Sequence, residues 1–224
     1  MASRAFAPVP VDWPEPLSRR AGVQHLIRRY SWCLRWAFTD RPWRVNFLNG
    51  PILVPQSDCG ERIYRVGCSD QNAAYFICKF LVPGMTFWDI GAHTGEFSLL
   101  AAKALEGEGV VRALEPHPVL FDLLSQNIRG KACVSTSRSA VAAEEGSSAM
   151  VVTAASSRLR GALDDAAQEW APTITLDALA ERSARIPNLI KVDVDGAERQ
   201  VLHPLALLQQ HALLAGSDAS PSHH

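Results

Sequence analysis

Between residues 85 and 210, short apolar segments alternate with segments whose apolar residues recur every three or four positions. The short segments predict strands at residues 85–91, 109–116, 132–141 and 188–194, with further extended pieces at 144–153 and 211–216. The periodic segments predict helices at residues 96–106, 118–128, 175–183 and 198–210. Strands alternating with helices form a mostly parallel sheet covered on both faces. The pattern therefore predicts an α/β fold.

The residues before this alternation predict a smaller set of elements. Residues 1–16 are rich in Pro and Ala and are expected to be mobile. Residues 17–84 are expected to form a helix, a hairpin that turns at Asn49-Gly50, and a second helix over residues 72–82. Residues 85–216 then form the main domain. Residues 217–224 are expected to be a disordered tail.

The first of these helices, residues 17–38, allows two interpretations. Its apolar positions recur at helical steps, and arginines and tryptophans accompany them: Val23, Leu26, Ile27, Tyr30, Leu34 and Ala37, with Arg19, Arg20, Arg28, Arg29, Arg35, Trp32 and Trp36. A basic amphipathic helix that carries Trp can lie on a membrane surface. The simpler alternative is a helix packed on the flank of the domain with a solvated basic face.

Composition narrows the classes of function. The chain has 224 residues, 47% of them hydrophobic, which fits one globular domain with a substantial core. The formal net charge of -1 gives no electrostatic case for a nucleic-acid partner. The sequence has no apolar run of membrane-spanning length and no apolar signal segment at its start, so a cytoplasmic protein is expected. Its 5 cysteines include no Cys-x-x-Cys pair, which argues against a structural zinc site.

The segment FWDIGAHTGEFSLL, residues 87–100, has the pattern of a ligand-binding turn. Asp89 lies at the end of a predicted strand, and Gly91 and Gly95 bracket a tight turn into the next helix. Ligands of open α/β sheets bind just beyond the carboxyl ends of the strands. Glu115 ends the following strand, about twenty residues after Gly95, where an acid can accept both hydroxyls of a ribose. These features predict a cofactor that contains a nucleoside.

The residues of this turn also discriminate between cofactors. A dinucleotide needs Gly-x-Gly-x-x-Gly, but His93 stands at the second glycine position. Glu96, in the first helical turn, would repel a pyrophosphate. Asp89 and Glu96 are expected to make the pocket acidic. S-adenosylmethionine suits such a pocket better, because it has no phosphate and carries a sulfonium and an ammonium group.

A second group of acids lies in LIKVDVDGAERQVL, residues 189–202. Asp195 and Glu198 have the spacing of a capping box at the start of a helix. Asp193 has no such structural role, so it is expected either at the active site or in a buried pair with Lys191. A metal held by Asp193 and Asp195 lacks a further ligand at motif spacing, and no metal is predicted.

Four segments in order resemble the conserved blocks of the FkbM-type S-adenosylmethionine-dependent methyltransferases: FWDIGAHTGEFSLLAA, RALEPHPVLFDLLSQN, TITLDAL and IKVDVDGAERQVL. His93 stands where the family has Asn, and Asp195 where it has Glu. The resemblance covers roughly residues 85–209. It implies a Rossmann-like methyltransferase sheet and usually O-methylation of a hydroxyl on a sugar, glycan or natural product. The predicted cofactor-binding residues are Asp89, Gly91, Ala92, His93, Gly95, Glu96, Glu115 and Pro116.

A hydroxyl acceptor loses a proton during methyl transfer, so a nearby base is expected. Asp193 and His93 are the predicted catalytic residues, whereas His117, just before Pro118, is expected to cap a helix. The sheet is expected to have about five strands in the order 3-2-1-4-5, where this class usually has seven. Such a truncated sheet ends at an exposed edge that could take a partner or a second copy. The alternative function is therefore a catalytically silent binding protein.

Overall fold

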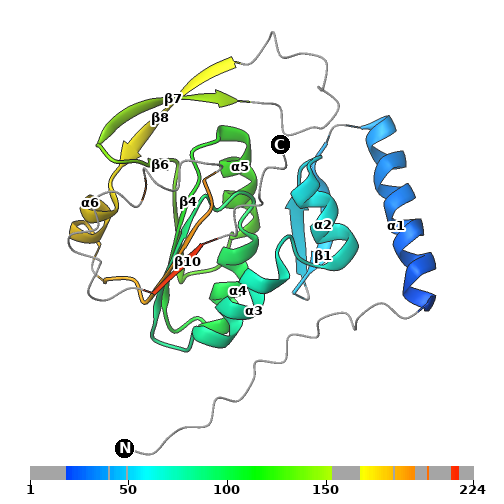
Figure 1. Cartoon of the computed structure of the whole chain (residues 1–224), viewed down its shortest axis with the longest axis horizontal. Helices are drawn as coiled ribbons and strands as arrows, with labels where there is room; N and C mark the ends of the chain where they lie inside the picture. Colours follow the sequence, from blue (N-terminus) through cyan, green and yellow to red (C-terminus); the bar gives the residue numbers. More distant parts are fainter. Residues whose placement is uncertain are drawn as a thin grey trace, which may run out of the picture.

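The computed structural model describes residues 19–39, 41–48, 50–152, 167–183, 185–194, 201 and 213–216. Its centre is a parallel sheet of five strands (Figure 1). The strand order is β10 (Leu213–Gly216), β9 (Leu189–Val192), β3 (Thr86–Ile90), β4 (Val110–Leu114) and β5 (Val134–Ser137). Numbered along the chain, this is the predicted order 3-2-1-4-5. The α/β fold with a mostly parallel sheet is therefore confirmed.

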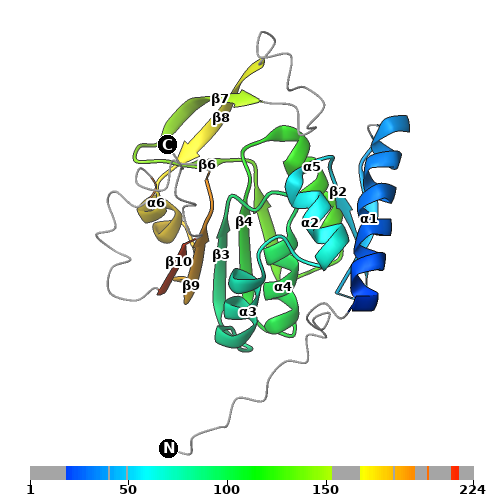
Figure 2. The same cartoon turned by 45° about the vertical axis from the view of Figure 1, so that its right-hand side comes forward.

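Helices cover both faces of the central sheet (Figure 2). Alternate residues of each strand point to opposite faces, so Phe87 and Leu189 join one core cluster while Trp88 and Ile190 join another. The first face carries α3 (Gln71–Phe80), α4 (Glu96–Ala104) and α5 (Pro118–Asn127), and the second carries α6 (Leu176–Glu181). The helices α4, α5 and α6 agree with three of the periodic segments, and α3 agrees with the helix predicted over residues 72–82. Asp195, Glu198 and the predicted helix over residues 198–210 lie outside the described residues, apart from the buried Val201.

A second sheet, of three strands, was not predicted. It consists of β6 (Ala140–Val141), β8 (Ala167–Ile174) and β7 (Gly146–Val152), with β8 in the middle. The segment 132–141, predicted as one strand, divides between this sheet and the central one. Gly146 begins β7, as the Glu-Gly turn indicates. The strand β8 was missed because Ala167–Ile174 contains Ala and Pro where an alternating strand would show bulky residues.

The N-terminal elements form a hairpin and an unpredicted helix. The strands β1 (Trp43–Phe47) and β2 (Gly50–Val54) pair antiparallel, and Phe47 pairs with Gly50. The hairpin is confirmed, but Gly50 already belongs to β2, and Asn49 of the predicted turn lies outside the described residues. The helix α2 (Asp58–Val66) was missed, because Gly60 interrupts its helical pattern. Ser57 accepts a hydrogen bond from the Gly60 N–H and begins this helix.

The first helix, α1 (Arg19–Phe38), packs through a different face from the one its aliphatic pattern indicates. Trp32 and Trp36 are buried, and Trp32 stacks on Trp43 and Tyr64 of the hairpin and α2. Leu26, Ile27, Tyr30, Leu34 and Phe38 are exposed instead. The helix does lie on the flank of the molecule (Figure 1), but its outward face is apolar rather than only basic. The aromatic pairs explain this choice, because tryptophans bury more apolar area than leucines.

One core cluster contains Trp32, Ile52, Phe87 and Leu100, so the N-terminal elements and the central sheet share a core. The division of the chain at residue 84 stays a prediction. None of the helices in the described parts of the chain is long and apolar enough to cross a membrane.

Candidate cofactor and active site

The loop between β3 and α4 is a tight turn with three residues in the left-handed region. Gly91, His93 and Gly95 have φ of 74°, 52° and 88°. The Gly91 and Ala92 N–H groups both donate to the Leu114 carbonyl at 2.9 Å, which fixes the loop against β4. A Cβ on Gly91 would lie 1.8 Å from the Asp193 carbonyl oxygen, so glycine is required where β9 ends against this loop. His93 is one of the residue types that tolerate the left-handed region.

Glu115 lies at the carboxyl end of β4 and its carboxylate holds two loops together. Its Oε2 accepts from the His93 N–H at 2.7 Å, and its Oε1 accepts from the His117 N–H at 3.0 Å. Burial raises the pKa of Glu115, and these two N–H groups act in the opposite direction. Each carboxylate oxygen retains further acceptor capacity. Glu115 can therefore hold the loop and still accept hydrogen bonds from a ligand.

Asp89 is completely buried in a pair with Lys191. The Lys191 Nζ lies 3.1 Å from the Asp89 carboxylate and donates to the Gly91 carbonyl at 2.9 Å. The Ser98 hydroxyl donates to the other Asp89 oxygen at 2.7 Å. Burial alone lowers the pKa of Lys191, but Asp89 and Asp193 together hold this pKa above its ordinary value. Asp89 thus orders the loop through Lys191, and its role as a cofactor ligand stays a prediction.

Asp193 follows β9 and is the exposed member of this group. Its side chain is 45% accessible, and its carboxylate lies 3.6 Å from the Lys191 Nζ. Its backbone N–H donates to the Ile90 carbonyl, which fixes it beside the end of β3. The sequence left open whether Asp193 pairs with Lys191 or faces the site. The structure shows the pair with Lys191, in which Asp193 itself is exposed, and a role of Asp193 at the active site stays a prediction.

Glu96 has a different environment from the one expected. It is buried, and it accepts hydrogen bonds from the Ser69 N–H at 2.8 Å and the Ser69 hydroxyl at 2.5 Å. Burial raises the pKa of Glu96, while donors from Cys68 and Ser69 lower it. Both carboxylate oxygens thus bind the connection between α2 and α3. The prediction that Glu96 lines an acidic pocket did not include Ser69 as its partner. A contact between Glu96 and a cofactor stays a prediction.

His93 places a neutral ring beside the charged residues. Burial, and then the nearby Lys191 ammonium, lower its pKa to about 4. Its Nδ1 is buried and has no hydrogen-bond partner among the described residues. Such an atom is costly unless a ligand or water satisfies it. His93 can therefore accept a hydrogen bond at neutral pH.

Cys59, on α2, is close enough to the site to interact electrostatically with Glu96, Lys191 and Asp193. Burial, and then Glu96, raise the pKa of its thiol to about 12. A thiolate is the nucleophilic form of cysteine. Cys59 therefore remains protonated at neutral pH, which argues against nucleophilic catalysis by this residue.

The remaining predicted binding residues support the loop. Ala92 is buried against α5, where it joins a cluster with Ala113 and Leu124. Pro116 connects Glu115 to His117, whose ring caps α5 by accepting from the Leu120 N–H at 3.4 Å. The predicted cap at His117 is therefore confirmed. Their contacts with a cofactor stay predictions.

The residues at this site fit S-adenosylmethionine. The Asp89 and Asp193 carboxylates lie 3.1 and 3.6 Å from the Lys191 ammonium, and Glu115 ends the neighbouring strand, so three carboxylates and one ammonium give the cluster an excess of negative formal charge. This charge suits a cationic sulfonium compound. Glu115 has acceptor capacity for ribose hydroxyls, and the His93 Nδ1 lacks a partner. The described residues contain no group of three or more His, Cys, Asp or Glu that could hold a metal.

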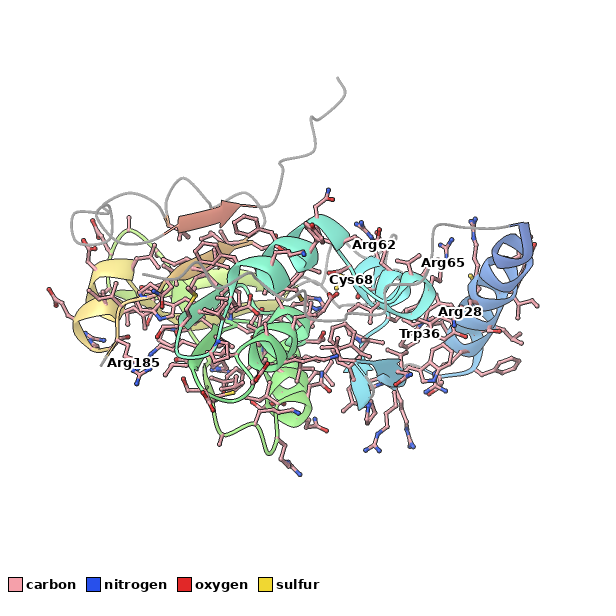
Figure 3. The ribbon with its side chains drawn as sticks, turned by 90° about the horizontal axis from the view of Figure 1, so that it is seen from below. Arg28, Trp36, Arg62, Arg65, Cys68 and Arg185 are labelled. Atoms are coloured by element: carbon pink, nitrogen blue, oxygen red, sulfur yellow. The ribbon has the colours of Figure 1, made fainter. Side chains whose placement is uncertain are left out.

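Two cavities formed by the described residues lie away from this cluster. One, of about 420 Å³, lies at the junction of α2 and α3 and includes Arg62, Arg65 and Cys68, which Figure 3 labels. The other, of about 900 Å³, lies between the hairpin and the C-terminal ends of α4 and α5. Neither contains a predicted site residue, and the candidate site is assigned from the side chains at the carboxyl ends of β3, β4 and β9.

Sequence reasoning missed Ser69, Ser98 and Cys59. Ser98 follows Asp89 by nine residues and lies on the buried side of α4, so helical spacing could have indicated it. Ser69 and Cys59 come from the N-terminal elements. They approach the site only through tertiary packing, and no local pattern indicates them.

Comparisons with known proteins support the family suggested by the motifs. The family model described as the methyltransferase FkbM domain matches residues 89–214. No protein of curated function matches the sequence significantly.

Several solved methyltransferase structures resemble the chain distantly. A methyltransferase FkbM from Methylobacillus flagellatus is 11% identical, with 80% of this chain and 44% of that chain covered and a TM-score of 0.39. A precorrin-6y C5,15-methyltransferase from Geobacter metallireducens is 17% identical, with coverages of 58% and 51% and a TM-score of 0.33. A protein described as a possible L-isoaspartate O-methyltransferase from Plasmodium falciparum, in complex with S-adenosyl-L-homocysteine, is 12% identical, with coverages of 55% and 56% and a TM-score of 0.27. The chain spans about half the length of these proteins.

Proposed function

The chain belongs to the FkbM family of methyltransferases, and on this premise we propose that it methylates a hydroxyl group of a sugar, glycan or natural product. The methyl donor is S-adenosylmethionine, which supplies an electrophilic methyl group when it is bound. The observation that supports hydroxyl methylation most directly is the position of Asp193. Its accessible carboxylate lies beside the cofactor loop, where an acceptor that loses a proton needs a base.

Some residues of the site bind the cofactor, and others take part in proton transfer. Glu115 and the loop around Gly91 hold the nucleoside portion of the cofactor. Asp193 takes the acceptor proton on a carboxylate oxygen, while Lys191, anchored to Asp89, keeps that carboxylate in place. The neutral His93 ring provides a hydrogen-bond acceptor through Nδ1. Holding the acceptor in line contributes the larger part of catalysis in a displacement reaction.

The first experiment tests cofactor binding by calorimetry with S-adenosylhomocysteine. The wild-type chain should bind, and Glu115→Gln should bind about tenfold more weakly or worse, because a neutral amide replaces the carboxylate. Glu106→Gln is the matched control, since Glu106 is exposed and distant in the fold from the loop. Absence of binding by the wild type would overturn the proposed function.

The second experiment tests turnover with a panel of sugars, glycosides and hydroxylated natural products. Asp193→Asn should lower the rate by about 100-fold or more and leave the affinity for S-adenosylhomocysteine within about tenfold. Asp122→Asn, on the exposed surface of α5, is the control. Unchanged turnover would remove Asp193 from the reaction. Binding without turnover on any acceptor would favour the silent binding protein.

A further inference from the structure

The helix α1 presents a continuous apolar stripe to solvent. The exposed fractions of its large apolar residues are 54% for Leu26, 59% for Ile27, 72% for Tyr30, 62% for Leu34 and 81% for Phe38. At helical geometry these residues occupy an arc of about 120° and a length of about 18 Å. Single exposed apolar residues are common, but a contiguous apolar patch marks a surface that contacts another protein or a membrane.

The opposite face of α1 is already packed against the rest of the molecule. Trp32 and Trp36 are buried there, and the Trp32 ring lies 5.7 Å from the rings of both Trp43 and Tyr64. Figure 3 shows Trp36 between α1 and the region of α2 and β1. The helix is therefore anchored with its stripe outward. Turning the stripe inward would expose both tryptophans.

The charge of α1 indicates what the stripe contacts. The helix contains five arginines and no acidic residue. On a helical wheel, Arg29 lies about 60° beyond one edge of the stripe, and Arg28 and Arg35 lie about 60–80° beyond the other. Arg28 and Arg29 are exposed, but Arg28 donates a hydrogen bond to the Arg65 carbonyl at 3.1 Å, and Arg35 is half-buried over the Trp43 ring. Arg28 and Arg35 therefore contact the body of the protein, whereas the exposed Arg29 can extend to a layer of anionic groups while the stripe enters an apolar layer.

We propose that α1 docks this protein onto the surface of an anionic lipid bilayer. The stripe lies at the boundary between headgroups and acyl chains, parallel to the membrane plane, and Arg29 contacts lipid phosphates. Charge decides against a second copy of the chain as the occupant. Two α1 helices facing one another would bring ten arginines together without a compensating carboxylate on either helix.

Vesicle co-sedimentation of the full chain tests this proposal. The probe is phosphatidylcholine vesicles that contain about one-third phosphatidylglycerol, with pure phosphatidylcholine vesicles as the reference. The chain should bind the anionic vesicles at least about tenfold more tightly, and salt of about 0.5 M should weaken this binding. Ile27→Ser with Leu34→Ser should reduce binding at least about tenfold. Arg29→Gln should reduce it about fivefold.

A matched control distinguishes binding through the stripe from nonspecific hydrophobic adsorption to vesicles. Val119→Ser with Ile186→Ser removes two aliphatic side chains that are 51% and 49% exposed outside α1, and binding should stay within about twofold. Circular dichroism melting confirms that each variant is folded. Absence of binding to anionic vesicles, or equal loss in the stripe and control variants, would overturn the proposal. So would a dimer that forms without lipid and is abolished by the stripe variant, since that result assigns α1 to a second copy.

Discussion

The buried pair of Asp89 and Lys191 should behave asymmetrically when each partner is removed. Among the described residues, Lys191→Met leaves the Asp89 carboxylate, which is 0% accessible, with only the Ser98 hydroxyl as a hydrogen-bond partner. Leaving a buried charge without its counter-ion costs about 3–5 kcal/mol. Asp89→Asn leaves Lys191 with the Gly91 carbonyl at 2.9 Å and the Asp193 carboxylate at 3.6 Å. This variant should therefore lose less, about 2 kcal/mol.

The size of the coupling energy between Lys191 and Asp89 follows from the same distances. Opposite unit charges at 3.1 Å attract by about 5 kcal/mol at an effective dielectric constant of about 20, and desolvation offsets much of this attraction. The double variant Lys191→Met with Asp89→Asn contains neither charge of the pair. Its stability should therefore exceed the additive expectation by about 1.5 kcal/mol or more.

Urea unfolding monitored by circular dichroism measures all three variants, with constant m-values as the test of two-state behaviour. Glu145→Gln is the control, because the pair of Glu145 with Arg182 has side chains that are 43% and 62% accessible. Its effect should stay below about 1 kcal/mol. Equal losses for the two single variants, or additivity within about 0.5 kcal/mol, would refute the assignment of Lys191 as the residue that neutralises Asp89.

Two further predictions concern the cofactor loop. Gly91→Ala should lower the free energy of unfolding by at least about 2 kcal/mol more than Gly107→Ala, and it should weaken the binding of S-adenosylhomocysteine in calorimetry. Both glycines have left-handed φ, but of the two only the Gly91 Cβ would meet a backbone oxygen, at 1.8 Å. Similar melting temperatures for the two variants would contradict this. The second prediction compares the free energy of unfolding in urea of the wild type with that of His93→Asn. As the pH falls from 6.5 to about 4, the wild type should lose at most about 3 kcal/mol relative to the variant. The reason is that His93 takes up its proton at a higher pH in the unfolded chain than in the folded one. A pH-independent difference would show that His93 titrates normally.

The central sheet could be predicted from the sequence because each of its signals is local. The strand ends at Asp89, Glu115 and Asp193 coincide with the end of an apolar run, and the next helix follows at once. The capping position of His117 before Pro118 is equally local. Parallel topology then brings the ends of neighbouring strands to one edge of the sheet. These local signals indicate the strands and the acids at their ends, whereas the order of the strands was implied by the resemblance to the FkbM family.

The missed features depend on contacts between distant segments. The outward face of α1 is determined by Trp43 and Tyr64, which occupy their positions only after the hairpin and α2 have formed. The role of Glu96 likewise depends on Ser69, 27 residues earlier in the chain. Local periodicity treats all apolar residues of a helix alike. It therefore cannot decide whether the leucines or the tryptophans of α1 pack inward.

The N-terminal elements are part of the candidate site rather than an appendage to it. Ser69, between α2 and α3, binds the Glu96 carboxylate at the start of α4. The Asn127 side chain at the end of α5 binds both the N–H and the carbonyl of Leu53 in β2, and it also donates to the Thr94 carbonyl inside the loop. Two independent sets of hydrogen bonds thus connect the hairpin and α2 to the two sides of the cofactor loop. A buried polar contact that is lost leaves its partner unsatisfied, so displacement of the hairpin would disturb Thr94 and Glu96 together. The geometry of the loop therefore depends on residues that precede the family domain as well as on the loop sequence itself.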